Sequence, residues 1–186
     1  MDEDKRQIVH LALGICAIAG VLAFGAQAVA NVAAAVLVCG LALVHAKLAR
    51  VHLGFFENFL ERLERPGSVP GYGALTYFAG MLAILTLLPS QQEILASLCI
   101  LGIGDSASTL IGIRSKRKLP YSRRKTVRGT LGFFLSSAPF ALYFAGLPGA
   151  LVAAIAALAE SLEARVDDNL IIAIVCVVAF RLIEAA

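Results

Sequence analysis

The chain has 186 residues, of which 59% are hydrophobic and only 16% are charged, and its mean hydropathy is +0.83. Soluble domains are roughly 45–50% apolar and about 25% charged. The composition and the modest net charge of +3 exclude a water-soluble globule, a disordered chain, a disulfide scaffold and a nucleic-acid-binding protein built on a soluble basic domain. Charged residues are absent from residues 7–46, 66–92 and 129–159, and uncharged apolar stretches of this length predict transmembrane helices.

Seven apolar helices are predicted, and together they form one all-α polytopic bundle in which residues 1–186 are a single integral membrane domain. Gly, Pro and polar residues supply the turns between them. In chain order the predicted helices are Ile8–Phe24, Asn31–Ala46, Tyr72–Leu88, Ile94–Ile113, Gly129–Ala145, Gly149–Leu162 and Asn169–Ile183. The first is expected to be retained, because no clear small-residue cleavage site accompanies it. Residues 48–65 mix charged and aromatic side chains, which is typical of a helix on the membrane surface or of an extension of the second helix.

The Lys and Arg residues gather on one side of this layout. With the N-terminus inside, 15 of the 16 fall on that side, and only Arg181 is left over. The positive-inside rule therefore predicts a cytoplasmic N-terminus. The four cysteines stand singly in apolar runs and are expected to be small buried packing residues. Small residues four apart in the first helix suit a homo-oligomer without establishing one.

Asp105 is the clearest break in the apolar background. It lies inside the fourth predicted helix, and an ionisable residue within a span is costly enough to be a functional-site hypothesis by default. Ser108 or Thr109, and Gly112, share its helical face. Two glycines just before Asp105 would let a backbone or a ligand come close. The alternative is an aspartate that only hydrogen-bonds a neighbouring helix.

The loop after this helix is strongly basic, with eight Lys or Arg among the fifteen residues from Arg114 to Arg128. One interpretation is a loop that sets topology and touches anionic lipid headgroups. The other is a polyphosphate site, because clustered Lys and Arg with small hydroxyl residues supply charge and hydrogen-bond donors. A metal-bound triphosphate would place Mg²⁺ on the carboxylate and its oxygens on the basic residues.

A second acidic group precedes and opens the last predicted helix. Glu160, Glu163 and Asp167 are predicted to lie along one helical stripe. Asp167 and Asp168 have an alternative role as helix N-cap residues, where acidic side chains are favoured. Glu160 is harder to explain structurally, because it follows 31 uncharged residues and lies near the membrane boundary.

The pattern GDSASTLIG, a basic loop, RRKTVRGT and then AES…VDDNL resembles the CTP-dependent lipid-alcohol kinases. That group includes dolichol kinase, phytol kinase and the CTP-dependent diacylglycerol kinase, and the related CTP:phosphatidate cytidylyltransferases share the first part of the pattern more than the last. The resemblance covers most of the chain. It implies a kinase that uses Mg²⁺ and transfers the γ-phosphate of CTP to the hydroxyl of a membrane lipid alcohol, such as dolichol, another polyprenol, geranylgeraniol or phytol. The active site would lie on the cytoplasmic side.

Carried over by position, the resemblance implies a metal held by Asp105, Glu160 and Asp168, which together with Lys125 would be the catalytic residues. The residues that would hold the nucleotide and its phosphates are Ser106, Ser108, Gly112, Lys116, Arg124, Lys125, Thr126, Arg128 and Asn169. Arg128 stands where family members usually have Glu, and Ser108 where they more often have Ala. Either Glu160 or Asp168 is the candidate base for the alcohol proton.

Two other functions compete with the kinase. A cytidylyltransferase would use the same nucleotide site but cleave CTP between its α- and β-phosphates to make a CDP-activated lipid. A non-enzymatic transporter or lipid-binding protein would use Asp105 and Glu160 as relay groups within the membrane, although the chain lacks the inverted repeats common in transporters. The identity of the lipid alcohol stays open.

Overall fold

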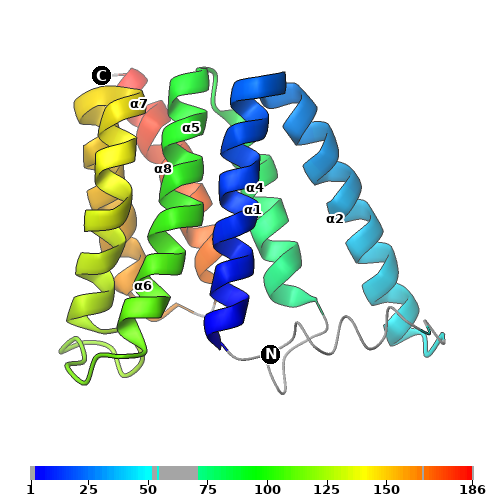
Figure 1. Cartoon of the computed structure of the whole chain (residues 1–186), viewed down its shortest axis with the longest axis horizontal. Coiled ribbons are helices and arrows are strands. Elements are labelled where there is room, and N and C mark those ends of the chain that lie inside the picture. The colour runs from blue at the N-terminus through cyan, green and yellow to red at the C-terminus, as the bar shows by residue number, and fades with distance from the viewer. Residues whose placement is uncertain (1–2, 52–53, 55–70, 165, 186) are drawn as a thin grey trace.

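The computed structural model describes residues 3–51, 54, 71–164 and 166–185, and this part of the chain is helical with no strand. The helices stand side by side as a bundle, with the two ends of the chain at opposite ends of it (Figure 1). The elements are α1 (Glu3–Phe24), α2 (Ala26–Leu48), α4 (Tyr72–Leu87), α5 (Gln91–Cys99), the π-helical turn η1 (Ile100–Gly104), α6 (Asp105–Gly112), α7 (Val127–Ser161) and α8 (Asp168–Glu184). The all-α prediction is therefore confirmed.

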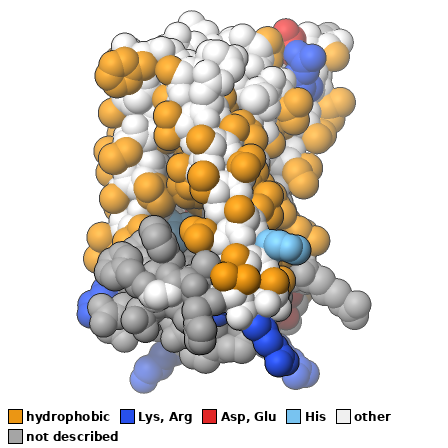
Figure 2. All heavy atoms as spheres, turned by 90° about the vertical axis from the view of Figure 1, so that its right-hand side faces the viewer, with side chains coloured by type: hydrophobic (Ala, Val, Ile, Leu, Met, Phe, Trp, Pro, Cys, Tyr) orange, Lys and Arg blue, Asp and Glu red, His pale blue; other side chains and the backbone are white. Residues whose placement is uncertain are grey.

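Four helices of the described chain are long and apolar enough to cross a membrane. They are α1, α2, the continuous helix Gln91–Gly112 and α7. Helix α4 is apolar but has only 16 residues, and a perpendicular span needs about 20. Figure 2 shows hydrophobic side chains along the length of the helices on one face, with most of the visible Lys and Arg at the lower end. The chain is thus an apolar helical membrane protein, and the predicted number of seven crossings stays a prediction.

Helix α7 is two antiparallel halves joined at Gly146, whose backbone is not helical (φ 64, ψ −153). A Cβ added at Gly149 would lie 2.1 Å from the carbonyl oxygen of Ala141. In a straight helix these two residues would be about 12 Å apart at 1.5 Å per residue. The reversal agrees with the break predicted between Ala145 and Gly149, and it returns the end of α7 to the level of its beginning.

The helix that carries Asp105 is positioned by close backbone contact. A Cβ added at Gly102 would lie 2.9 Å from the Cα of Gly14, so α1 and η1 touch through their glycines. The π-helical turn ends at Gly104, immediately before Asp105. Such turns shift the helical face that follows and are frequent at functional sites. The predicted close approach before Asp105 is confirmed, and the neighbour is the backbone of α1.

Most of the core lies between α4, α5, α7 and α8, where Tyr77, Phe133 and Ile172 are fully buried, and α1, α2 and η1 contribute the rest. All four cysteines are free, and Cys99 and Cys176 are buried as predicted. The same prediction is wrong for the two others, because Cys16 on α1 and Cys39 on α2 are exposed. The surface helix predicted for residues 48–65 lies almost wholly outside the described residues.

Candidate functional site

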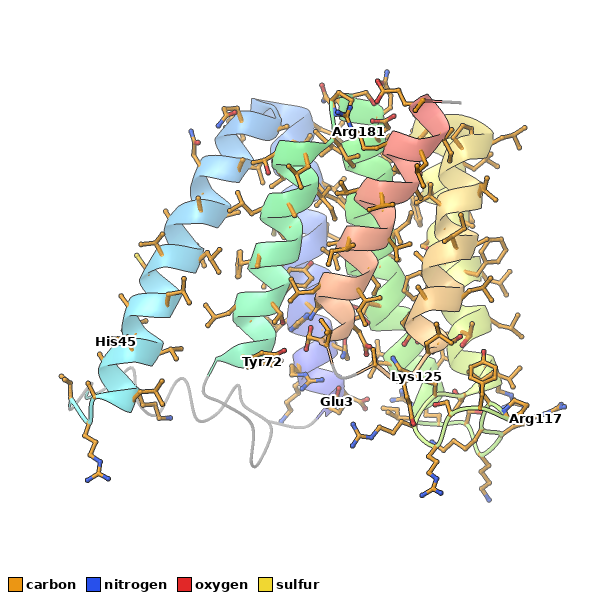
Figure 3. The ribbon with its side chains drawn as sticks, turned by 180° about the vertical axis from the view of Figure 1, so that it is seen from behind. Glu3, His45, Tyr72, Arg117, Lys125 and Arg181 are labelled. Atoms are coloured by element: carbon orange, nitrogen blue, oxygen red, sulfur yellow. The ribbon has the colours of Figure 1, made fainter. Side chains whose placement is uncertain are left out.

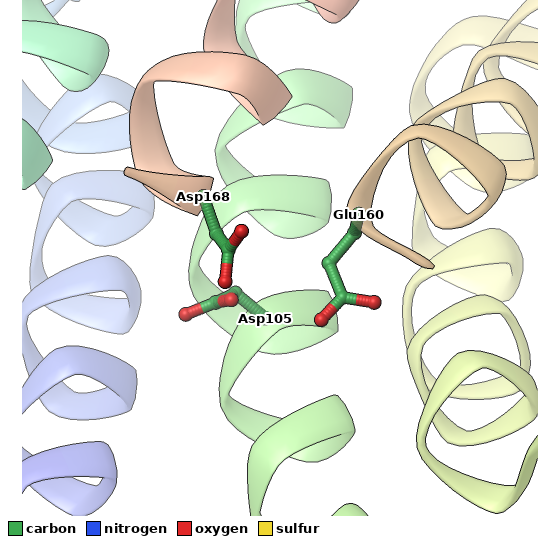
Figure 4. Close-up of side chains that lie close together, drawn as sticks. All are labelled: Asp105, Glu160 and Asp168. Carbon is green, nitrogen blue, oxygen red and sulfur yellow. The ribbon is translucent and has the colours of Figure 1, made fainter. Parts of the chain in front are cut away.

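Three carboxylates from three different helices meet near one end of the bundle. Asp105 opens α6, Glu160 lies near the end of α7 and Asp168 opens α8 (Figure 4). One oxygen of each lies within 4.8 Å of the others. Asp105 is 7% exposed and Glu160 only 2%, whereas the Asp168 side chain is 39% exposed. The structure thus brings together the three residues that the sequence nominated as metal ligands, and leaves one side of the cluster open.

The start of α8 is built by a cap that aims Asp168 at the cluster. Asp167 is the N-cap, and its Oδ1 accepts hydrogen bonds from the backbone N–H of Asn169 at 3.1 Å and from the Asn169 side chain at 2.7 Å. The hydroxyl of Thr76 on α4 donates to the same oxygen at 2.9 Å. The capping alternative is therefore right for Asp167, while Asp168 belongs to the first turn of α8.

Lys125 joins two of the three carboxylates. Its Nζ donates to Glu160 Oε1 at 2.5 Å and to Asp168 Oδ2 at 2.7 Å. Burial lowers the pKa of Lys125, but the charges of Glu160 and Asp168 outweigh it and raise the pKa above the ordinary value. The hydroxyl of Ser108 donates to the same Glu160 oxygen at 3.0 Å. Among the eight basic residues of the loop, the structure therefore selects Lys125 as the cation of the cluster.

The charge and donor set of this cluster fit a divalent cation. With all three carboxylates ionised, as ligands of a cation would be, they and one ammonium carry a net charge of −2, which one Mg²⁺ would neutralise. Carboxylate oxygens are the ligands that Mg²⁺ prefers. Glu160 Oε2 is buried and has no hydrogen-bond partner in the described part of the chain. Buried polar atoms normally have a partner, so this oxygen is available to coordinate a cation. The residues present are therefore suited to holding the ion.

The basic loop reaches the cluster because it folds back on itself and is fastened to the end of α7. Leu119 N–H donates to the carbonyl of Lys125 at 3.1 Å. Glu163 accepts hydrogen bonds from the Arg124 backbone N–H at 2.7 Å and from the Ser122 hydroxyl at 3.2 Å. The Arg124 N–H lowers the pKa of Glu163, so this carboxylate stays ionised at neutral pH.

The prediction that Glu160, Glu163 and Asp167 share one helical stripe is wrong. Helix α7 ends at Ser161 and the next residue, Leu162, is extended (φ −80, ψ 139). Glu163 therefore follows the helix instead of continuing its face. It holds the loop in place, Asp167 caps the next helix, and only Glu160 enters the cluster.

The other predicted phosphate ligands fall into two groups. Lys116, Arg124 and Arg128 are exposed around the loop, and no ion pair in the described structure joins their side chains to the three carboxylates. Figure 3 places Arg117 and Lys125 at the same end of the bundle, with Arg181 at the opposite end. Ser106 and Asn169 are buried, and no hydrogen bond joins either to Asp105, Glu160 or Asp168.

Thr126 and Gly112 have structural tasks in this fold. Thr126 is the N-cap of α7, and its hydroxyl accepts the Gly129 N–H at 3.1 Å. A Cβ added at Gly112 would lie 3.2 Å from that hydroxyl, so the glycine lets α6 approach the cap. Neither contact involves the three carboxylates or Lys125.

Replacing Thr126 with alanine is expected to lower the free energy of unfolding by about 1 kcal/mol, since the capping hydrogen bond is lost. Thr126→Ser should keep the cap and the stability. Thermal unfolding of the purified protein measures both. A residue that acted only on bound phosphate would leave the unfolding temperature of the alanine variant unchanged, so an unshifted transition would contradict the capping role.

Several residues at the site had no signal in the sequence. Tyr77 is 1% exposed, and its hydroxyl donates to the carbonyl of His10 at 3.1 Å across the gap between α4 and α1. Thr76 supports the α8 cap, and Tyr121 contacts Ser161 through their hydroxyls at 2.9 Å. These partners are 40 to 91 residues apart along the chain, so no local pattern indicates them.

No family model matches the chain, and no solved structure matches it. The chain is similar to "Uncharacterized protein MJ1137" of the archaeon Methanocaldococcus jannaschii. The two are 33% identical over 172 residues, which cover 91% of this chain and 88% of the relative. The match therefore covers nearly the whole chain, including the segments that carry the three carboxylates and Lys125. This protein belongs to the same family as that archaeal protein.

Proposed function

We propose that this protein is a CTP-dependent kinase that phosphorylates the hydroxyl of a membrane lipid alcohol with Mg²⁺ as cofactor. The observation that carries the proposal is the cluster of Asp105, Glu160, Asp168 and Lys125 beneath a basic loop, at one end of an apolar bundle. Carboxylates, a lysine and exposed arginines are the parts that phosphoryl transfer needs. The choice of CTP and of a lipid alcohol rests on the resemblance of the GDSASTLIG, RRKTVRGT and VDDNL segments to that family.

Each group has a task in the proposed reaction. Mg²⁺, when held by the three carboxylates, would neutralise phosphate charge. Lys125 would place the phosphates, and the exposed Lys116, Arg124 and Arg128 would attract the nucleotide. The alcohol oxygen forms a bond to the γ-phosphorus while the bond from that phosphorus to the β–γ bridging oxygen breaks, which releases CDP.

Asp168 is the better candidate for accepting the alcohol proton. Both carboxylates accept a hydrogen bond from Lys125, but the Asp168 side chain is 39% exposed, whereas Glu160 is 2% exposed and also accepts one from Ser108. A general base has to come within hydrogen-bond distance of the proton that it removes. The open edge of the cluster, at the start of α8, is where a lipid hydroxyl can meet that requirement.

We further propose a multi-pass protein whose basic end faces the cytoplasm. Asp4 near the N-terminus is paired with Arg114 of the basic loop at 2.9 Å, so both belong to one end of the bundle, and Arg181 lies at the other (Figure 3). The positive-inside rule then supports a cytoplasmic N-terminus and active site. Seven crossings would require α4, α8 and each half of α7 to span the membrane as short helices.

The proposal is tested with purified protein, Mg²⁺ and a panel of lipid alcohols and lipid phosphates. CTP labelled at the γ-phosphate is compared with CTP labelled at the α-phosphate, and ATP serves as the control nucleotide. Transfer of the γ-label alone to an alcohol is the expected result. Transfer of the α-label to a phosphorylated lipid would instead assign a cytidylyltransferase. Failure of CTP to bind would contradict both enzymes and favour a non-enzymatic role.

A further inference from the structure

A cavity of about 380 Å³ lies between α1, α2 and α4, apart from the carboxylate cluster. Its walls carry only apolar or small side chains. They are Leu13, Cys16, Ala17, Gly20 and Phe24 of α1, Ala28, Val29, Val32 and Ala33 of α2, and Phe78 and Met81 of α4. An apolar lining of this kind favours hydrocarbon over water. The lining therefore suits a hydrocarbon group.

The cavity begins beside the functional site. Leu13 adjoins Gly14, whose added Cβ would lie 3.1 Å from the Tyr77 hydroxyl and 2.9 Å from the Cα of Gly102. Gly102 is three residues before Asp105, which is less than one helical turn. Phe78, in the same wall, follows Tyr77 and its ring lies 6.1 Å from the Tyr77 ring. The Leu13 end is therefore the end of the cavity nearer to the cluster, and the Gly14–Gly102 contact and Tyr77 lie between the two.

The other end is closed by the turn between α1 and α2. Helix α1 ends at Phe24 and α2 begins at Ala26, so the single residue Gly25 (φ 85) makes the reversal. From Leu13 to Phe24 the cavity wall follows twelve residues of α1, and the eleven rises between them correspond to about 16 Å. Along its side, Cys16 and Val32 are exposed to the surroundings of the bundle. This shape suits one hydrocarbon chain lying parallel to the helices and entering from the side.

We infer that this cavity holds the hydrocarbon chain of the alcohol substrate, with the hydroxyl at the Leu13 end, which is the end nearer to the carboxylate cluster. That the ligand is an alcohol rests on the proposed function. The first 16 Å or so of the chain would contact protein, and a longer polyprenol would leave through the open side. The cavity would therefore orient the bound alcohol, and it would accept alcohols that differ in chain length.

The native cysteines provide a test that does not depend on catalysis. Cys16 lines the cavity and Cys39 lies elsewhere on α2, while both are free and exposed. In detergent micelles of fixed composition, both thiols are alkylated with N-ethylmaleimide and counted by peptide mass spectrometry, with and without geranylgeraniol. At ten times its Kd the alcohol should slow alkylation of Cys16 about tenfold, because only the empty fraction reacts. Cys39 should react at an unchanged rate.

Two matched variants give a second measurement. Val32 and Val38 are both on α2 and are 64% and 65% exposed, but only Val32 lines the cavity. Val32→Trp should abolish the protection of Cys16 and raise the KM for the alcohol with the KM for CTP unchanged, and Val38→Trp should do neither. Because both side chains are about two-thirds exposed, neither substitution replaces a side chain of the buried core.

The outcomes separate the two proposals. Protection of Cys16 without phosphate transfer would support the cavity assignment and reject the kinase. Phosphate transfer with no protection of Cys16, or equal effects of the two tryptophan variants, would overturn the cavity assignment alone. Protection of Cys16 that rises with protein concentration and needs no added alcohol would identify the cavity as a contact between copies of the chain, and would also overturn it.

Discussion

Replacing Lys125 with methionine is expected to lower the free energy of unfolding by about 3 kcal/mol. Removing one partner of a buried ion pair typically costs about 3–5 kcal/mol, because the remaining charge is left without compensation. The lower value applies here because the Lys125 side chain is 19% exposed. In a chain of this size the unfolding temperature should fall by roughly 6–12 °C. Methionine keeps the length and most of the packing of the lysine stem, so the loss reports the charge.

The reason for this large effect is Glu160. It is 2% exposed and has Lys125 and Ser108 as its hydrogen-bond partners. Adding Glu160→Gln to the lysine variant removes the unpaired charge and should restore a large part of the stability. Lys116→Met is the control, because Lys116 is an exposed lysine of the same loop. Equal unfolding temperatures for the Lys116 and Lys125 variants would contradict the proposed ion pair.

Asp105 and Glu160 could be predicted from the residues alone because the surrounding composition makes them conspicuous, whereas the role of Asp168 was implied only by the resemblance. Asp105 and Glu160 interrupt long uncharged stretches, and a charge is tolerated there only with a partner or a function. The hairpin in α7 could be predicted as well, since the Pro and Gly residues around Gly146 break any helix. Strong local signals in apolar surroundings therefore indicated two of the three carboxylates that the fold brings together.

What could not be predicted depends on packing between distant segments. Eight basic residues follow α6, and nothing local separates Lys125 from the others until the loop folds back against α7. Thr126 lies in a motif that favours phosphate, yet its hydroxyl caps a helix. Glu163 was placed on a helical face by its spacing, but α7 ends two residues earlier. In each case a helix end or a tertiary contact determines the role.

The second large effect is expected at Asp105. Replacing it with asparagine keeps the shape and removes the charge, which leaves Glu160, Asp168 and Lys125 with a net charge of −1 in place of −2. A divalent cation then loses both a ligand and part of its electrostatic attraction. Wild-type protein at 100 times the Kd for Mg²⁺ should gain about 2.7 kcal/mol of stability, or roughly 5–10 °C in unfolding temperature. The Asp105→Asn variant should show almost none of this gain.

The same substitution should reduce kcat/KM for γ-phosphate transfer by at least about 10²-fold, since groups aimed at developing charge contribute that much or more. Asp167→Asn is the matched control. Asp167 is a nearby carboxylate whose Oδ1 accepts three hydrogen bonds at the α8 cap, and asparagine keeps that oxygen and is itself a favoured N-cap. This control should keep both the Mg²⁺-dependent stability and the activity.

If Asp105→Asn still gains stability when Mg²⁺ is added, the ion binds elsewhere. Asp105 is then a structural residue, as the alternative of an aspartate that only hydrogen-bonds a neighbouring helix predicts. If the shift is lost while transfer persists, the site binds metal without serving the reaction. Only the joint loss of both, with Asp167→Asn unaffected, makes the carboxylate cluster the place where the phosphate is transferred.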